Sequence, residues 1–319
     1  MTESGTPNTS SGWVIVLAVC GVIGVVAVAG TLFLVNQQSA QRAGFPDDVA
    51  PAPTAEYGRR LITQTSWLIG PEHPDPAQRF SGNGLNCSSC HLDAGTIPGT
   101  LSLTEAFQKY PKFSGRDGKE ADLKERIDGC MERSMNGRTL PRDSVEMDAM
   151  VAYVRSLSDQ FAAMNASRRA VSEPAPFRAP TRAASPEEGA KVFETRCVVC
   201  HGRDGAGMLA SSDRRRGYLF PPVWGQDSFN NGAGMGRVLT ASKFIKARMP
   251  LGNAILTDDE AFDVAAYINS QTRAAIDPAR LEQDYPDLTK KPVDAPYGPY
   301  ADSWSITRHK FGPFVDPGR

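Results

Sequence analysis

The chain has 319 residues, of which 22% are charged, and its formal net charge is -1. This length suggests two domains, at a typical size of about 150 residues each. The near-neutral balance excludes a global electrostatic attraction to nucleic acid or to an anionic surface, so any charge-based function must come from local clusters.

The N-terminal region contains one long apolar segment, Trp13 to Val35, which carries no charged residue. About 20 apolar residues cross a bilayer as a helix, whereas the apolar part of a signal peptide spans only about 7–15 residues after a basic region. Residues 1–12 contain no Lys or Arg. We therefore expect a cytoplasmic N-terminus at 1–12 and an uncleaved transmembrane signal anchor at 13–35, with cleavage after Ala29 as the alternative.

Composition divides the rest of the chain into two similar halves. Residues 36–55 form a Pro-rich stalk, 165–184 form a linker of the same kind, and 276–319 form a tail rich in Pro, Asp and Tyr. The segments between them, 56–164 and 185–275, each show a helix pattern, a Cys-x-x-Cys-His motif, a long loop and a final helix pattern. We predict one domain for each segment.

Helix signals support this division. Ser185 to Glu188 has the spacing of a capping box with proline at the first helical position, and Thr257 to Glu260 has the same spacing before the last helix. In the first half, helix-like patterns cover Tyr57 to Gly70 and begin again between Asp143 and Glu146. No run of alternating residues favours a sheet.

The motif Cys-Ser-Ser-Cys-His in the first half recurs as Cys-Val-Val-Cys-His in the second, and a later Ala-Tyr-Val recurs as Ala-Tyr-Ile. CxxCH is typical of covalent c-type haem attachment, because the two thiols reach the two vinyl groups of one porphyrin and the histidine binds the iron. A lone CxxC fits a zinc half-site, a redox pair or a disulfide, but two copies followed by histidine favour two haems. The predicted attachment residues are Cys87, Cys90 and His91 for haem 1, and Cys197, Cys200 and His201 for haem 2.

The predicted fold class is therefore all-α, with two tandem class I-like cytochrome c domains preceded by one transmembrane helix. Covalent haem attachment is expected on the non-cytoplasmic side of the membrane. We expect a single-pass protein of the inner membrane, with its haem domains in the periplasm.

Each iron needs a sixth ligand or keeps an open site. In the second half, Met249 just before the last helix is preferred over Met235 in a Gly-rich loop. The repeat places Met135 at the equivalent position of the first half. The same loop holds Cys130, the only cysteine outside the apolar segment that no CxxCH uses, so both residues are candidates for haem 1.

Two stretches resemble the dihaem thiosulfate dehydrogenases. They are Ser-Gly-Asn-Gly-Leu-Asn-Cys-Ser-Ser-Cys-His-Leu-Asp-Ala-Gly at 81–95 and Arg-Ile-Asp-Gly-Cys-Met-Glu-Arg-Ser-Met-Asn-Gly-Arg at 126–138. The resemblance covers most of residues 56–275. It implies that Cys130 is the distal ligand of haem 1, where two thiosulfate ions are oxidised to tetrathionate. Haem 2 would pass the electrons to a respiratory acceptor, such as a periplasmic cytochrome or a membrane oxidase.

The same resemblance places Arg126, Arg116 and Ser134 in the substrate pocket, with Arg138 where the family usually has a lysine. Two thiosulfate dianions repel each other strongly in a low-dielectric pocket. Guanidinium groups offset this repulsion and match oxyanions with paired N–H donors. Nearby glutamates also fit another interpretation, in which these arginines form a solvated basic helix face.

Two other functions fit the same features. A membrane-tethered dihaem electron carrier, or an oxidase subunit without substrate chemistry, would use Met135 at haem 1 and leave the arginines without a role. A related sulfur-oxidising haem protein would instead transfer sulfur to a carrier.

Overall fold

The computed structural model describes residues 51–164 and 176–315. The predicted membrane anchor and most of the stalk lie outside the described residues, as does part of the predicted linker. Within the described ranges, no helix is both long enough and apolar enough to cross a membrane.

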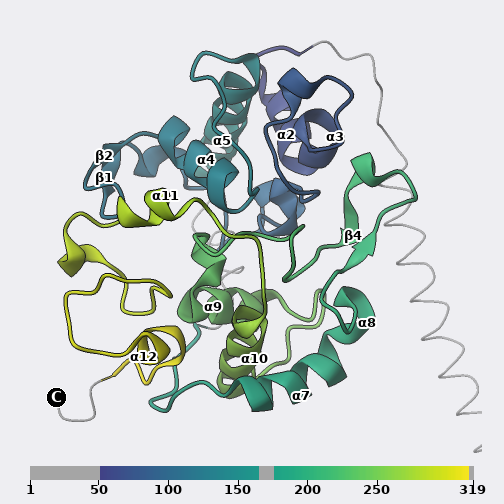
Figure 1. The fold of residues 1–319 in the computed structure, drawn as a ribbon. Coiled ribbons are helices and arrows are strands. Elements are labelled where there is room, and N and C mark those ends of the chain that lie inside the picture. Colours follow the sequence, from purple (N-terminus) through teal and green to yellow (C-terminus); the bar gives the residue numbers. More distant parts are fainter. Residues whose placement is uncertain (1–50, 165–175, 316–319) are drawn as a thin grey trace, which may run out of the picture. The chain divides into compact units, whose positions relative to one another are not determined.

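Helices make up most of the regular structure, as predicted (Figure 1). The α-helices are α2 (Ala55–Thr63), α3 (Thr65–Ile69), α4 (Leu123–Arg133), α5 (Val145–Ala163), α7 (Pro186–Arg196), α8 (Val198–His201), α9 (Val238–Arg248), α10 (Asp258–Ser270), α11 (Pro278–Glu282) and α12 (Ile306–Phe311). The strands are β1 (Lys112–Ser114), β2 (Lys119–Ala121), β3 (Met208–Leu209) and β4 (Tyr218–Phe220).

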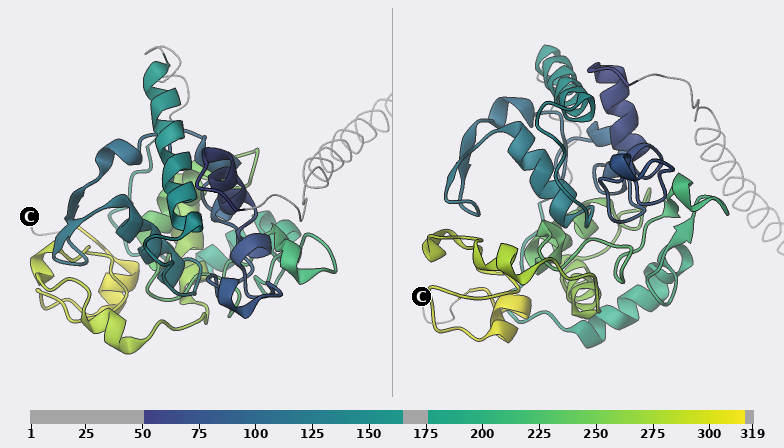
Figure 2. Two further views of the ribbon diagram at one scale, coloured as in Figure 1. Left: turned by 90° about the horizontal axis from the view of Figure 1, so that it is seen from above. Right: turned by 45° about the horizontal axis from the view of Figure 1, so that its top comes forward.

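Each half is built on a pair of packed helices, α2 with α5 and α7 with α10 (Figure 1, Figure 2). At these contacts a Cβ on Gly58 or Gly189 would lie only 1.9 or 2.0 Å from a carbonyl oxygen of the facing helix. Only glycine therefore allows the two backbones to approach so closely. Tyr153 and Tyr267 lie against the same glycines, which explains why the Ala-Tyr motif recurs.

The local helix signals of the sequence are confirmed. The Thr257 and Glu260 side chains cap each other's backbone N–H groups at the start of α10, and Ser185 caps the start of α7. The segment expected to be one helix from Tyr57 to Gly70 is two, because the chain leaves the helical conformation at Gln64.

Two short antiparallel hairpins correct the expectation that no sheet is present. β1 pairs with β2 and β3 pairs with β4. No strand in the described part exceeds three residues, which is too short to show the alternation that identifies a strand from sequence. Both hairpins lie in loops between helices and leave the helix-rich architecture intact.

The C-terminal tail packs against both halves of the chain. The backbone N–H of Tyr285 donates to the carbonyl of Arg116 at 2.7 Å, which ties the tail to the first half. Asp294 lies 2.8 Å from the Nε of Arg237 at the start of α9, which ties it to the second. The buried His309 hydrogen-bonds to the carbonyl of Val293 and to the carboxylate of Asp302, both in the tail. Its ring stacks on that of Tyr300, with 3.5 Å between the ring centroids.

Candidate functional site

The two CxxCH histidines are held in the orientation that iron ligation needs. The Nδ1 of His91 lies 2.7 Å from the carbonyl oxygen of Leu101, and the Nδ1 of His201 lies 2.8 Å from that of Pro221. Because a carbonyl can only accept, Nδ1 carries the hydrogen and Nε2 keeps its lone pair for a metal. Burial lowers the pKa of both imidazoles, which favours the neutral ligand form. These residues therefore fit two haems.

The thiols of the first motif lie in a short helical turn. Cys87 begins this 3-10 turn, and Cys90 is its C-cap. Burial raises the pKa of the Cys87 thiol to about 11 and that of Cys90 to about 12. In the second half Cys197 ends α7, and burial raises the pKa of its thiol to about 11. None of these three cysteines forms a disulfide, so each sulfur is available for attachment to a haem.

Cys130 lies on α4 and close to the first motif. Its charge contributes to raising the pKa values of both Cys87 and Cys90. Arg126 stands one turn earlier on the same helix, and the charge of Cys130 is the largest cause that raises the pKa of Arg126. The structure thus gathers the predicted thiol, a predicted arginine and the first haem motif.

Arg116 lies in the turn between β1 and β2, where distant parts of the chain hold it. Its Nη1 donates to the carbonyl of Gly232 at 2.9 Å and lies 3.6 Å from Oδ2 of Asp284. The charge of Arg116 is a smaller influence that opposes the rise in the pKa of Arg126 caused by Cys130. The two guanidinium groups therefore lie near enough to interact. Two cations held close together form a site suited to anions.

Asp284 and Tyr110 are site residues that the sequence did not identify. Asp284 is buried, with its side chain 4% exposed; it lies 2.8 Å from Nη2 of Arg133 and accepts a hydrogen bond from Tyr297. It therefore neutralises the buried Arg133 as well as facing Arg116. Tyr110 lies close enough to Arg126 for each side chain to influence the pKa of the other. Both residues lie in irregular segments without a motif, so no sequence signal marked them.

The two remaining predicted pocket residues differ in their surroundings. Ser134 is the C-cap of α4, and its backbone N–H donates to the carbonyl of Cys130 at 2.8 Å. Arg138 is exposed; it donates to two carbonyls of the 77–80 loop at 2.6 and 3.1 Å and lies 4.0 Å above the Phe80 ring. The contacts of Arg138 lie outside the Cys130 group, whereas Ser134 adjoins it through the backbone. The pocket roles of both residues stay predictions.

Met135, the other candidate ligand of haem 1, lies in the core of the first half. Its side chain is buried among apolar residues against which Cys87 also packs. Its carbonyl accepts from the N–H of Gly82 at 2.9 Å. Cys130 and Met135 therefore both lie near the first motif, and the choice of Cys130 stays a prediction.

At haem 2, the two candidate methionines occupy neighbouring elements. Met249 is the C-cap of α9, and Met235 lies in a 3-10 turn just before the start of that helix. Both are partly buried against the core of the second half, as is Cys197. Arg248 donates to the carbonyl of Pro98 in the first half, and its guanidinium has no free lone pair with which to displace a methionine.

Met249→Ala is expected to abolish the methionine–iron charge-transfer band of haem 2, while both haems stay attached through their cysteines. The absorption spectrum of the oxidised protein measures this band. Met235→Ala is the matched control and should keep it. The reverse result would make Met235 the ligand.

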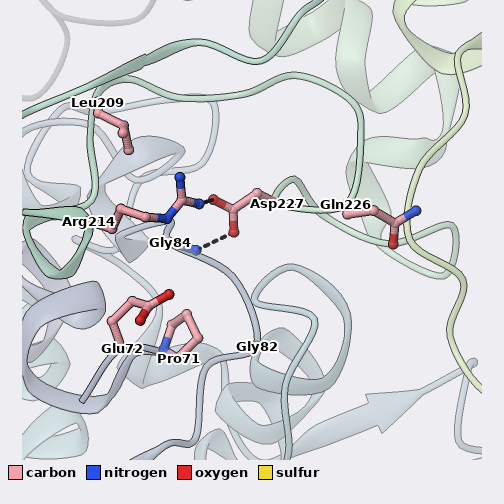
Figure 3. A pocket seen from close by; sticks show the side chains of 8 residues that line it. All are labelled: Pro71, Glu72, Gly82, Gly84, Leu209, Arg214, Gln226 and Asp227. Atoms are coloured by element: carbon pink, nitrogen blue, oxygen red, sulfur yellow. Dashed lines mark hydrogen bonds and ion pairs between the residues drawn. The ribbon is translucent and has the colours of Figure 1, made fainter. Parts of the chain in front are cut away.

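A separate pocket of about 300 Å³ lies between the two halves (Figure 3). Asp227 accepts from the N–H of Gly84 at 2.8 Å and lies 3.4 Å from Nη2 of Arg214. The lining includes neither Cys130 nor a CxxCH residue, so this pocket is distinct from the predicted substrate site. The lining residues are Pro71, Glu72, Gly82, Gly84, Leu209, Arg214, Gln226 and Asp227.

Comparison with known proteins supports the division into two haem domains. Residues 78–162 match the family described as SoxA/TsdA, cytochrome c domain, and residues 186–272 match the cytochrome c family. A thiosulfate dehydrogenase of Stutzerimonas stutzeri is 36% identical over 276 residues, which cover 82% of this chain and 85% of that protein. A thiosulfate dehydrogenase of Allochromatium vinosum is 37% identical over 221 residues, which cover 68% of this chain and 77% of that protein.

A solved structure shares the fold. The as-isolated form of thiosulfate dehydrogenase (TsdBA) from Marichromatium purpuratum matches with a TM-score of 0.60 at 32% identity. The match covers 74% of this chain and 50% of that chain, so the matched part spans about half the length of the solved chain.

Proposed function

We propose that this chain, which belongs to the thiosulfate dehydrogenase family, oxidises two thiosulfate ions to one tetrathionate ion beside its first CxxCH motif. The observation that carries the proposal is the grouping of Cys130 and two arginines at that motif. An electron carrier without substrate chemistry has no need of this grouping. The experiment that tests it is the replacement of Cys130, which is argued in the Discussion.

The reaction joins two sulfur atoms and releases two electrons, and no proton is gained or lost. The two c-type haems, when bound, supply one-electron acceptors for these electrons. The residues of the chain must bring two dianions into contact, and the repulsion between them is strongest as the S–S bond forms. Arg126 and Arg116 offset this repulsion with two positive charges and paired N–H donors. Cys130 is the residue that would hold the iron of haem 1 through its thiolate, beside the arginine that would bind the substrate.

We further propose that electrons leave through haem 2 to a respiratory acceptor, such as a periplasmic cytochrome or a membrane oxidase. A thiolate ligand carries a negative charge and stabilises the oxidised iron, whereas a methionine ligand raises the potential. With Cys130 at haem 1 and Met249 at haem 2, electrons would move from the first to the second. This direction suits oxidation of thiosulfate.

The haem domains are proposed to lie in the periplasm, tethered to the inner membrane by residues 13–35. The full-length protein is expected to fractionate with membranes and to keep its natural N-terminus, because the uncharged segment is long enough to span a bilayer. Haem staining of membrane and soluble fractions, with N-terminal sequencing, measures this.

The control for the anchor is a chain that begins at residue 36 behind a cleavable signal peptide, which should be soluble and equally active. Recovery of the full-length product as a soluble haem protein with an N-terminus near Gly30 would contradict the anchor.

A further inference from the structure

We propose that Asn230, which belongs to the second haem domain, is a positioning residue for Cys130 in the first. The inference rests on the proposed role of Cys130 as haem ligand and catalytic thiol. Asn230 does not reach the reacting atoms; it would act by fixing the end of the helix that carries Cys130.

The argument begins with the backbone of α4. The last carbonyls of a helix have no partner within the helix and need one from elsewhere. At the end of α4 the carbonyl of Cys130 accepts from the N–H groups of Ser134 and Met135 at 2.8 and 2.9 Å. The next carbonyl, of Met131, accepts from Gly137 at 2.9 Å. The carbonyls that follow, of residues 132, 133 and 134, are capped by groups outside this segment.

Asn230 provides two of these three caps. Its Nδ2 donates to the carbonyl of Glu132 at 2.8 Å, and its backbone N–H donates to the carbonyl of Arg133 at 3.0 Å. The third carbonyl, of Ser134, accepts from Nδ2 of Asn83 at 3.0 Å. The helix end that follows Cys130 is therefore capped largely from the other domain.

Asn230 is itself held rigidly. Its side chain is buried, with the residue 1% exposed. Its Oδ1 accepts from the N–H of Gly232 at 3.1 Å, and its Nδ2 also lies 3.2 Å from Oδ1 of Asn136. Truncation of the side chain would leave the carbonyl of Glu132 without its Nδ2 donor. The backbone N–H of residue 230 would still cap the carbonyl of Arg133.

The 227–232 segment that carries Asn230 is fixed on both sides. The buried Asn83 donates to the carbonyl of Ser228 at 3.1 Å as well as to that of Ser134. The Oγ of Ser228 donates to the carbonyl of Pro222 at 3.1 Å, and Pro221 is the residue whose carbonyl orients His201. A short chain of hydrogen bonds therefore links the haem 2 ligand region to the end of α4.

Position matters here because the thiol of Cys130 must meet both iron and substrate. A displacement of about 1 Å in a reacting group can lower the rate by about a hundredfold. Asn230→Ala and Asn230→Asp are therefore expected to lower kcat by about ten- to a hundredfold with little change in KM. Both variants should also broaden or split the haem 1 signal in electron paramagnetic resonance spectra of the oxidised full-length holoprotein, and leave the haem 2 methionine band unchanged.

The matched control is Asn231→Ala in the same segment. The Oδ1 of Asn231 accepts from the N–H of Ile276 at 2.9 Å in the tail, so its loss should leave the haem 1 signal unchanged. Ser228→Ala removes only the bond to Pro222 and gives a milder change should the Asn230 variants fail to fold. It should also broaden the haem 1 signal, but less than the Asn230 variants do.

Three outcomes would overturn the positioning role. One is a haem 1 signal and a kcat that equal those of the wild type in both Asn230 variants. If the Asn230 variants do not fold, the same result in Ser228→Ala would overturn the role. Another is an equal effect of Asn231→Ala, and the third is parallel loss of the haem 2 band, which would indicate general disruption. Failure of the proposed function is seen separately, because the wild-type protein would then form no tetrathionate from thiosulfate. Absence of a thiolate signal in the wild type would remove Cys130 as the haem 1 ligand.

Discussion

Cys130→Ala is expected to abolish thiosulfate oxidation while both haems remain attached. Attachment depends on the CxxCH thiols, whereas the proposed chemistry depends on the thiol of Cys130 near the first motif. Loss of a residue that acts directly in the reaction should lower kcat by at least about a thousandfold. Tetrathionate formation with an artificial electron acceptor measures the rate, and the haem content per chain measures attachment.

Two further variants separate ligation from catalysis. Cys130→Met should raise the potential of haem 1, because a neutral thioether replaces a thiolate, and should remain inactive. Met135→Ala should keep the thiolate signal at haem 1, although loss of this buried side chain (3% exposed) should lower the free energy of unfolding by about 2–5 kcal/mol.

The wild-type rate of thiosulfate oxidation in Cys130→Ala would contradict the catalytic role. A haem 1 spectrum that changes in Met135→Ala and not in Cys130→Met would make Met135 the ligand. That result would favour the alternative of a membrane-tethered electron carrier.

The features that the sequence predicted well are local ones. The capping box at Thr257 and the proline-led start of α7 after Ser185 depend on groups a few residues apart. The CxxCH motifs are local for the same reason. The Ala-Tyr repeat indicated equivalent helices, but only the structure shows that each tyrosine packs at a close glycine contact, at Gly58 or Gly189.

The features that the sequence missed are contacts between distant segments. Asp284 belongs to a tail without periodicity, yet it is the buried partner of Arg133. Asn230 lies in a polar, Gly-rich stretch typical of a surface loop, yet it is almost completely buried against α4. Such contacts depend on the packing of the two halves and the tail, which no local pattern encodes. Arg133 stands near Cys130 in sequence, as the predicted pocket arginines do, and only its burial against Asp284 identifies it as part of a structural ion pair.

Arg126→Gln is expected to lower kcat/KM for thiosulfate by about ten- to a hundredfold, and Arg116→Gln should act in the same direction. A hydrogen bond to a charged group contributes about 1.5–3 kcal/mol, which corresponds to this range. Repulsion between the two dianions grows as their sulfur atoms approach, so kcat should fall as well as KM rise. Arg126→Lys should recover part of the loss, because it keeps the charge and loses the paired donors.

The control for the arginines is Arg59→Gln, because Arg59 is an exposed residue on α2 paired with Glu56. It should leave kcat and KM unchanged, since an exposed pair of this kind contributes little. Initial rates at several thiosulfate concentrations and two ionic strengths measure all four variants. If the arginines act by charge, raising the ionic strength should weaken thiosulfate binding in the wild type more than in Arg126→Gln. Equal kcat and KM in Arg126→Gln, Arg116→Gln and the wild type would show that these arginines form a solvated basic face, and the substrate would then have to bind elsewhere.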